Sequence, residues 1–116
     1  MQQIPPYVKL VVYTPTTHAD AVREAIAQAG GGCIGKYTAC SFSVKGIGRF
    51  RPEAGAKPHI GKVGRLEAVE EERIEVTVRD IVLEDVLRAI AAVHPYEEMA
   101  CDVYPLVSEV KLPRRQ

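Results

Sequence analysis

The chain has 116 residues, of which 47 % are hydrophobic and 26 % charged, and its 15 basic and 15 acidic side chains leave no net charge. This length and balance are typical of one domain with a single hydrophobic core, and they exclude a disordered or collagen-like chain. Zero net charge argues against nucleic-acid binding through bulk charge. The longest apolar run, residues 89–93, is far too short to cross a membrane. We therefore expect a domain that binds neither nucleic acid nor membrane.

The N-terminal residues and the cysteines indicate the compartment. The chain starts without the basic and apolar segments of a signal peptide. It holds three cysteines, an odd number without CxxC spacing: Cys33, Cys40 and Cys101. Cysteines in this number and spacing are typical of free thiols in a reducing compartment, so we expect a cytoplasmic protein. We also expect Cys40 and Cys101 to lie in strands as small buried hydrophobic side chains.

The first half of the chain predicts a strand followed by a helix. Residues 7–13 are β-branched and aromatic, as in a strand. Apolar residues then recur every three or four positions over residues 19–29, which predicts one buried helix face. Thr17 is a candidate N-cap for this helix. Three glycines at 30–32 favour its end, because glycine readily adopts the left-handed conformation after a last turn.

The second half repeats this order. Residues 73–79 alternate between apolar and polar side chains, which is typical of a half-buried strand. A wide apolar stripe over residues 82–93 predicts a helix. We expect the helix to end at His94, because His94 precedes a proline and such a residue avoids the helical conformation.

Each strand–helix unit needs a returning strand, which residues 36–44 and 100–107 are expected to supply. The resulting βαββαβ order predicts an α+β, ferredoxin-like split βαβ fold, in one domain over residues 1–116 with a short tail at about 107–116. Both helices of this fold cover the same sheet face, so the other face is uncovered. We expect other subunits of a homo-oligomer to bury it, most simply in a closed ring; the alternative is a monomer with a polar open face.

The arm, at about residues 45–66, is longer than a minimal fold of this kind requires. Residues 36–65 hold seven basic side chains and one acid, whereas residues 67–75 hold five acids and one base. Three interpretations are open: the arm binds an anion, lies against the acidic strand of a neighbouring subunit, or is simply solvated. The candidate anion-binding residues are Arg49, Arg51 and Lys57.

Residues 94–98, HPYEE, place an imidazole and two carboxylates within five positions. Such groups could bind a divalent metal ion or act as an acid–base pair. The candidate metal ligands are His94, Glu97, Glu98 and His59. The structural alternative is that His94 satisfies terminal carbonyls of the preceding helix while Tyr96 packs. How close the three histidines lie to one another is left open.

Catalytic motifs are missing from the sequence. It contains no serine nucleophile elbow, HExxH or GxGxxG pattern. An enzyme would have only His94 with Glu97 or Glu98 as its acid–base group. The sequence therefore favours a non-catalytic role.

Several motifs together resemble one family. They are YTACSFS at residues 37–43, GIGRFRP at 46–52, GAKPHIGKVG at 55–64 and HPYEE at 94–98. In these motifs the chain resembles the insert domain of the Nif-three-like dinuclear-metal proteins, the YqfO group, over about residues 7–106. That insert is similar to the trimeric PII and CutA proteins, which have a ferredoxin-like core and an extended hairpin arm.

The resemblance implies a stand-alone version of this insert, with a trimer as the favoured homo-oligomer. None of the family's metal ligands has a matching position here, so neither the dinuclear site nor a cyclohydrolase-like activity is carried over. We expect a non-catalytic, cytoplasmic, oligomeric module with a regulatory or assembly role. The alternative is a sensor that binds a divalent metal ion, or a nucleotide or other anion, at a subunit cleft.

Overall fold

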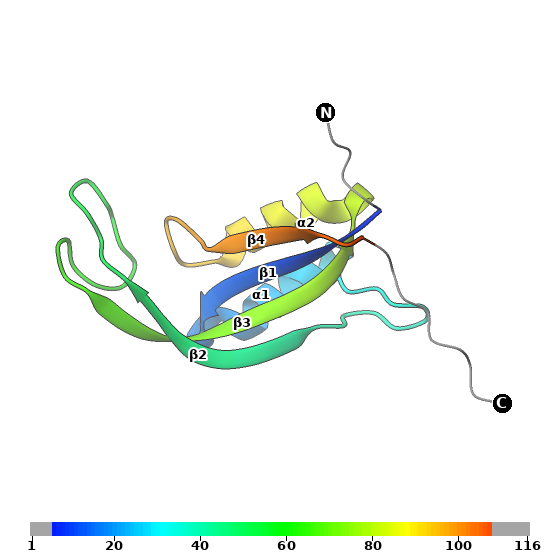
Figure 1. The fold of residues 1–116 in the computed structure, drawn as a ribbon, viewed down its shortest axis with the longest axis horizontal. Coiled ribbons are helices and arrows are strands. Elements are labelled where there is room, and N and C mark those ends of the chain that lie inside the picture. Colours follow the sequence, from blue (N-terminus) through cyan, green and yellow to red (C-terminus); the bar gives the residue numbers. More distant parts are fainter. Residues whose placement is uncertain (1–5, 108–116) are drawn as a thin grey trace.

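The computed structural model describes residues 6–107, so the tail expected after residue 107 lies almost entirely outside them. Its elements are β1 (Tyr7–Pro15), η1 (Thr16–His18), α1 (Ala19–Gln28), β2 (Phe42–Phe50), β3 (Glu67–Arg79), α2 (Asp80–Val93) and β4 (Cys101–Pro105). The strands form one antiparallel sheet in the order β2-β3-β1-β4. Both helices lie on the same side of it (Figure 1). The predicted ferredoxin-like α+β fold is confirmed.

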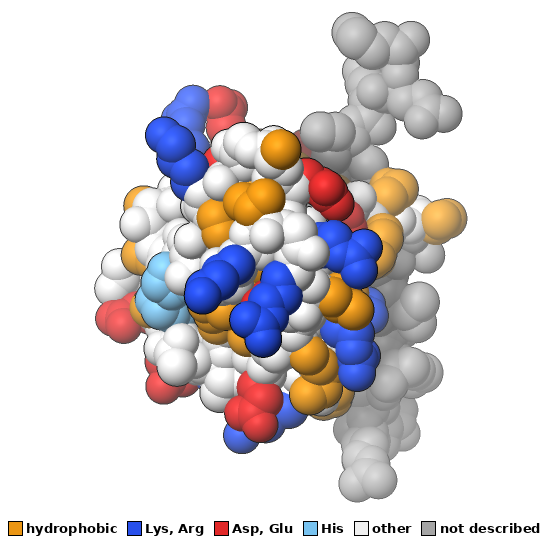
Figure 2. Space-filling view, turned by 90° about the vertical axis from the view of Figure 1, so that its left-hand side faces the viewer, with side chains coloured by type: hydrophobic (Ala, Val, Ile, Leu, Met, Phe, Trp, Pro, Cys, Tyr) orange, Lys and Arg blue, Asp and Glu red, His pale blue; other side chains and the backbone are white. Residues whose placement is uncertain are grey.

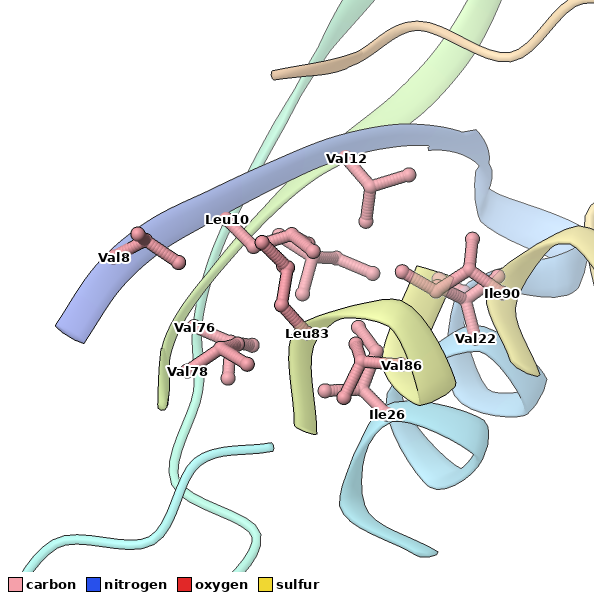
Figure 3. Packing of buried hydrophobic residues seen from close by; sticks show 12 residues of the cluster. Val8, Leu10, Val12, Val22, Ile26, Val76, Val78, Leu83, Val86 and Ile90 are labelled. Carbon is pink, nitrogen blue, oxygen red and sulfur yellow. The ribbon is translucent and has the colours of Figure 1, made fainter. Parts of the chain in front are cut away.

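The core lies between the sheet and the two helices. Strands β1 and β3 pair over their central residues, with Leu10 opposite Val76 and Val12 opposite Ile74. Because side chains alternate along a strand, these residues point together toward the helices. Leu83 of α2 and Val22 of α1 pack against them (Figure 3). This is the apolar pattern that the sequence predicted in both halves.

The other sheet face has no covering layer within residues 6–107 (Figure 1). Apolar and aromatic side chains are exposed on it or at its edges, with exposed fractions of 64 % for Phe42, 49 % for Val44 and 46 % for Tyr104. Two arginines lie over tyrosine rings there, Arg73 over Tyr13 at 5.8 Å from the ring centroid and Arg79 over Tyr7 at 5.9 Å.

The arm is a long β-hairpin that extends beyond the core (Figure 1). Strands β2 and β3 pair from Phe42 opposite Glu75 to Phe50 opposite Glu67. Residues 46–50 of the arm therefore belong to strand β2. Seen end-on, the arm presents Lys and Arg side chains among hydrophobic ones (Figure 2). Its projection makes the molecule elongated, with principal extents of 57 × 36 × 22 Å.

The connection from α1 to β2 differs from the prediction. A strand was expected over residues 36–44, but a tight turn occupies the first part of this segment. Ile34 and Tyr37 exchange backbone hydrogen bonds, and the Cys40 N–H donates to the Gly32 carbonyl oxygen at 2.9 Å. These local bonds delay the strand until residue 42. Cys40 consequently lies in the connection, not in a strand.

The N-terminal cap of the first helix was also predicted wrongly. The 3₁₀ turn η1 precedes α1, and no side chain caps the helix. The Thr17 hydroxyl instead contacts His18 Nδ1 at 2.8 Å. No helix within residues 6–107 is long and apolar enough to span a membrane.

Candidate ligand-binding site

A cavity of about 490 Å³ lies between the arm and the connection from α2 to β4. This volume is in the range of small-molecule sites. Aromatic rings form much of its wall: those of Tyr13, Phe50, His59 and Tyr96. A hydrogen bond joins the two segments: the backbone N–H of Lys57 donates to Glu97 Oε2 at 2.9 Å.

His94 positions the α2–β4 connection. It is buried, and its Nδ1 accepts a hydrogen bond from the Tyr96 N–H at 3.2 Å. A nitrogen that accepts carries no proton, so Nε2 carries it and donates to the Tyr13 carbonyl oxygen at 2.7 Å. Both ring nitrogens are therefore engaged. The ring binds a carbonyl of β1, not the last carbonyls of α2 that the structural interpretation expected.

Tyr96 links the α2–β4 connection to the arm through ring contacts and one hydrogen bond. Its ring centroid lies 5.3 Å from that of His94, 5.7 Å from Phe50 and 6.5 Å from His59. Its hydroxyl donates to Glu71 Oε2 at 2.8 Å. Burial, together with this bond to a carboxylate, raises the pKa of Tyr96 well above its usual value. The phenol consequently stays protonated and keeps its role as donor.

Glu71 of β3 fits into a space left by a glycine of β2. Gly48 lies diagonally across from it, opposite Val69, and a Cβ at Gly48 would clash with the Glu71 carboxylate. Gly46, which lies directly opposite Glu71 on the same strand face, has open space beside it. An isolated glycine within a strand often marks such a close approach. Gly48 is thus the residue that allows the carboxylate to turn inward.

The structure brings several predicted site residues to this cavity. Its lining includes Arg49, Arg51, His59, Glu97 and Glu98. Lys57 takes part through its backbone N–H, and His94 only through the bonds described above. Of the three histidines, His18 and His59 lie close together, with ring centroids 5.7 Å apart. Within residues 6–107, no group of three His, Cys, Asp or Glu side chains could hold a metal ion.

The arm's charges are partly paired within the chain. Arg65 forms an ion pair with Glu67 at 3.9 Å, whereas the buried Glu72 pairs with Arg23 of α1.

Three residues of the site were not predicted from the sequence: Glu71, Gly48 and Tyr13. Gly48 was the detectable signal, since a glycine inside the strand suggests a neighbouring side chain that needs its space.

None of the three cysteines lines the cavity. Among the described residues all three cysteines are free; Cys33 is exposed, and Cys40 and Cys101 are half-buried rather than buried. Burial, and secondarily the charge of Asp102, raise the pKa of Cys101 to about 11. A thiol with this pKa is a poor nucleophile at neutral pH.

The comparisons with known proteins point in one direction. No family model matches the chain. The chain is 52 % identical over 101 residues to a GTP cyclohydrolase 1 type 2 homolog of Halalkalibacterium halodurans, covering 87 % of this chain and 27 % of that protein. It is 48 % identical to the Bacillus subtilis protein of the same name, with the same coverage. The chain thus spans about a quarter of the length of these relatives.

Solved structures agree. The crystal structure of a Bacillus cereus protein related to NIF3 matches with a TM-score of 0.78 and 43 % identity, over 92 % of this chain and 27 % of that one. The periplasmic divalent cation tolerance protein CutA from Archaeoglobus fulgidus matches with a TM-score of 0.65 over 90 % of this chain and 88 % of its own, at 17 % identity, which shows the fold alone. The predicted resemblance is confirmed: the chain is homologous to a segment of the Nif-three-like proteins of the YqfO group, and it has a CutA-like fold.

Proposed function

We propose that this chain is a non-catalytic, cytoplasmic module that assembles into a homo-oligomer and has a regulatory or assembly role. The uncovered sheet face carries the proposal. Exposed apolar side chains grouped on a sheet face are typical of an interaction surface, and Phe42 and Val44 are neighbours of this kind on β2. A second copy of the chain would remove them from water. The resemblance to trimeric PII and CutA proteins favours three copies in a closed ring.

Size-exclusion chromatography with light scattering tests this proposal. The expected mass at micromolar concentration is a multiple of 12.7 kDa. Phe42→Glu places a charge on the proposed interface and is expected to lower the mass. Ile81→Glu is the matched control, because Ile81 is 71 % exposed but lies on α2, on the other side of the sheet. A strictly monomeric wild-type protein would contradict the proposal.

The cavity supports a second candidate, a small-ligand sensor. Its site is concave, largely aromatic and flanked by charged groups, as small-molecule sites commonly are. The sequence predicts two ligand classes: an anion near Arg49, Arg51 and Lys57, or a divalent metal ion near His59, His94, Glu97 and Glu98, although within residues 6–107 no three such side chains are placed around one metal position. Calorimetry with zinc, copper, ATP and ADP tests these classes. The absence of both heat and thermal shift with all four would remove them.

A further inference from the structure

We propose that the centre of the cavity binds an organic ammonium ion, with the carboxylate of Glu71 as the ion's partner. The inference rests on the sensor function proposed above and deepens it, since it assigns a different ligand class to the same cavity. It does not depend on the oligomer. Four features carry it: a buried acid with a free oxygen, aromatic walls, an excess of acidic groups and a glycine that makes room for the acid.

One carboxylate oxygen of Glu71 accepts a hydrogen bond, and the other has no hydrogen-bond partner among the described residues. The residue is only 8 % exposed, and its Oε2 accepts the bond from Tyr96. Among the residues that the structure describes, no donor bonds Oε1 and no basic group pairs with the carboxylate. The cavity is lined by this residue. Because the Glu71 carboxylate has no cationic partner within the described chain and its Oε1 is not shielded from solvent, a cationic ligand in the cavity could pair with it there.

The walls of the cavity suit an organic cation better than a bare metal ion. Phe50 and Tyr96 present aromatic rings, and such rings attract ammonium groups within about 6 Å of the ring centroid. A metal ion would instead need several oxygen or nitrogen ligands. Within the described part of the chain, no three His, Cys, Asp or Glu side chains are placed to supply them.

The charge of the lining also favours a cation. Its residues include four acids and two arginines, a net charge of −2. The acids are Glu53, Glu71, Glu97 and Glu98. One arginine, Arg49, alternates with Gly48 and Phe50 along β2, so strand geometry directs its side chain to the opposite face. The Arg49 guanidinium is therefore directed away from the side of the strand that Gly48 leaves open to Glu71.

Binding to an aromatic ammonium probe tests the proposal. The full chain, labelled with ¹⁵N, is titrated with benzylammonium chloride and followed by amide chemical shifts. Benzyl alcohol and sodium benzoate serve as the neutral and anionic counterparts of similar shape. We expect benzylammonium to bind at least tenfold more tightly than either counterpart, with shifts at residues that line the cavity. Glu71→Gln removes the charge with little change in shape, and it should weaken binding of benzylammonium at least tenfold.

A pair of glycine variants gives a control that leaves Glu71 in the sequence. Gly48→Ala displaces the Glu71 carboxylate and should weaken binding at least fivefold. Gly46→Ala adds the same methyl group two residues away, where nothing lies nearby, and should change affinity less than twofold. Thermal unfolding of each variant shows that it remains folded.

Three results would overturn the proposal: no binding of benzylammonium, equal or tighter binding of benzyl alcohol or benzoate, or unchanged affinity in Glu71→Gln. Tighter binding of benzoate would at the same time support the anion-sensor candidate. Light scattering on the same samples reports the oligomer separately, so failure of the ligand proposal and failure of the assembly proposal are distinguishable.

Discussion

Replacing Arg23 should destabilise the fold, because Arg23 is the partner of a buried acid. Its guanidinium donates to Glu72 Oε1 at 2.7 Å, and the same group reaches Ser43 Oγ at 3.0 Å and Asp20 Oδ1 at 2.6 Å. The Glu72 side chain is only 9 % exposed, whereas that of Asp20 is fully exposed. The carboxylates of Asp20 and Glu72 raise the pKa of Arg23 above its usual value, so the side chain stays charged.

The expected loss of unfolding free energy follows from the carboxylate that the substitution leaves without a partner. In Arg23→Met the apolar stem is kept, but Glu72 remains buried without its cation. A buried charged group that loses its partner costs roughly 2–3 kcal/mol of unfolding free energy, and partial exposure of Arg23 places the expected value at about 2 kcal/mol. For a chain of this length, that loss lowers the thermal midpoint by about 8 °C.

Urea unfolding of a double-mutant cycle measures the effect. Glu72→Gln in the Arg23→Met background should recover most of the lost stability, because the orphaned charge is then gone. Asp20→Asn is the control, since an exposed ion pair contributes between 0 and about 1 kcal/mol. The reasoning is refuted if Arg23→Met costs under about 0.5 kcal/mol, or no more than Asp20→Asn does.

Two further predictions concern the end of α2 and β4. His94→Ala should cost about 1–3 kcal/mol of unfolding free energy, because the Tyr13 carbonyl and the Tyr96 N–H lose their hydrogen-bond partner. Replacement of the exposed His59 by alanine is the control and should cost little. Equal costs of the two substitutions in urea unfolding would contradict the positioning role of His94. Cys101 should react with iodoacetamide at pH 8 far more slowly than the exposed Cys33, because its raised pKa, about 11, keeps the thiol protonated. Mass spectrometry of the alkylated peptides reports both rates. A faster reaction at Cys101 would contradict this prediction.

The core and topology could be predicted from the sequence because they depend on local periodicity. Period-two alternation in β3 and the apolar stripe of α2 each place one buried face without reference to distant residues. The start of β2 could not be predicted in this way. Residues 36–41 have composition that suits a strand, but the hydrogen bonds of the turn around Ile34 and Tyr37 override that preference.

The candidate site depends on register rather than on composition, and this explains why only its outline was predictable. The sequence motifs of the arm and of residues 94–98 predicted three residues of the lining by their charges and glycines: Arg51, His59 and Glu97. Glu71, by contrast, is one of three consecutive acids in β3 whose side chains lead to different environments. Glu72 pairs with Arg23 on the helix side, and Glu71 turns into the space beside Gly48.

This distinction follows from the pairing of β2 with β3. With Gly46 opposite Glu71, the adjacent Gly48 lies on the same face and leaves space for the carboxylate. Because β3 is also paired with β1, a shift of one residue in this register would turn Gly48 to the other face of the sheet and bring Ile47 or Arg49 beside Glu71. The hydroxyl of Tyr96, 25 positions along the chain from Glu71, then selects which oxygen remains free. A ligand site defined by one carboxylate oxygen is therefore a property of strand pairing and of one long-range hydrogen bond, and neither is encoded in any short motif.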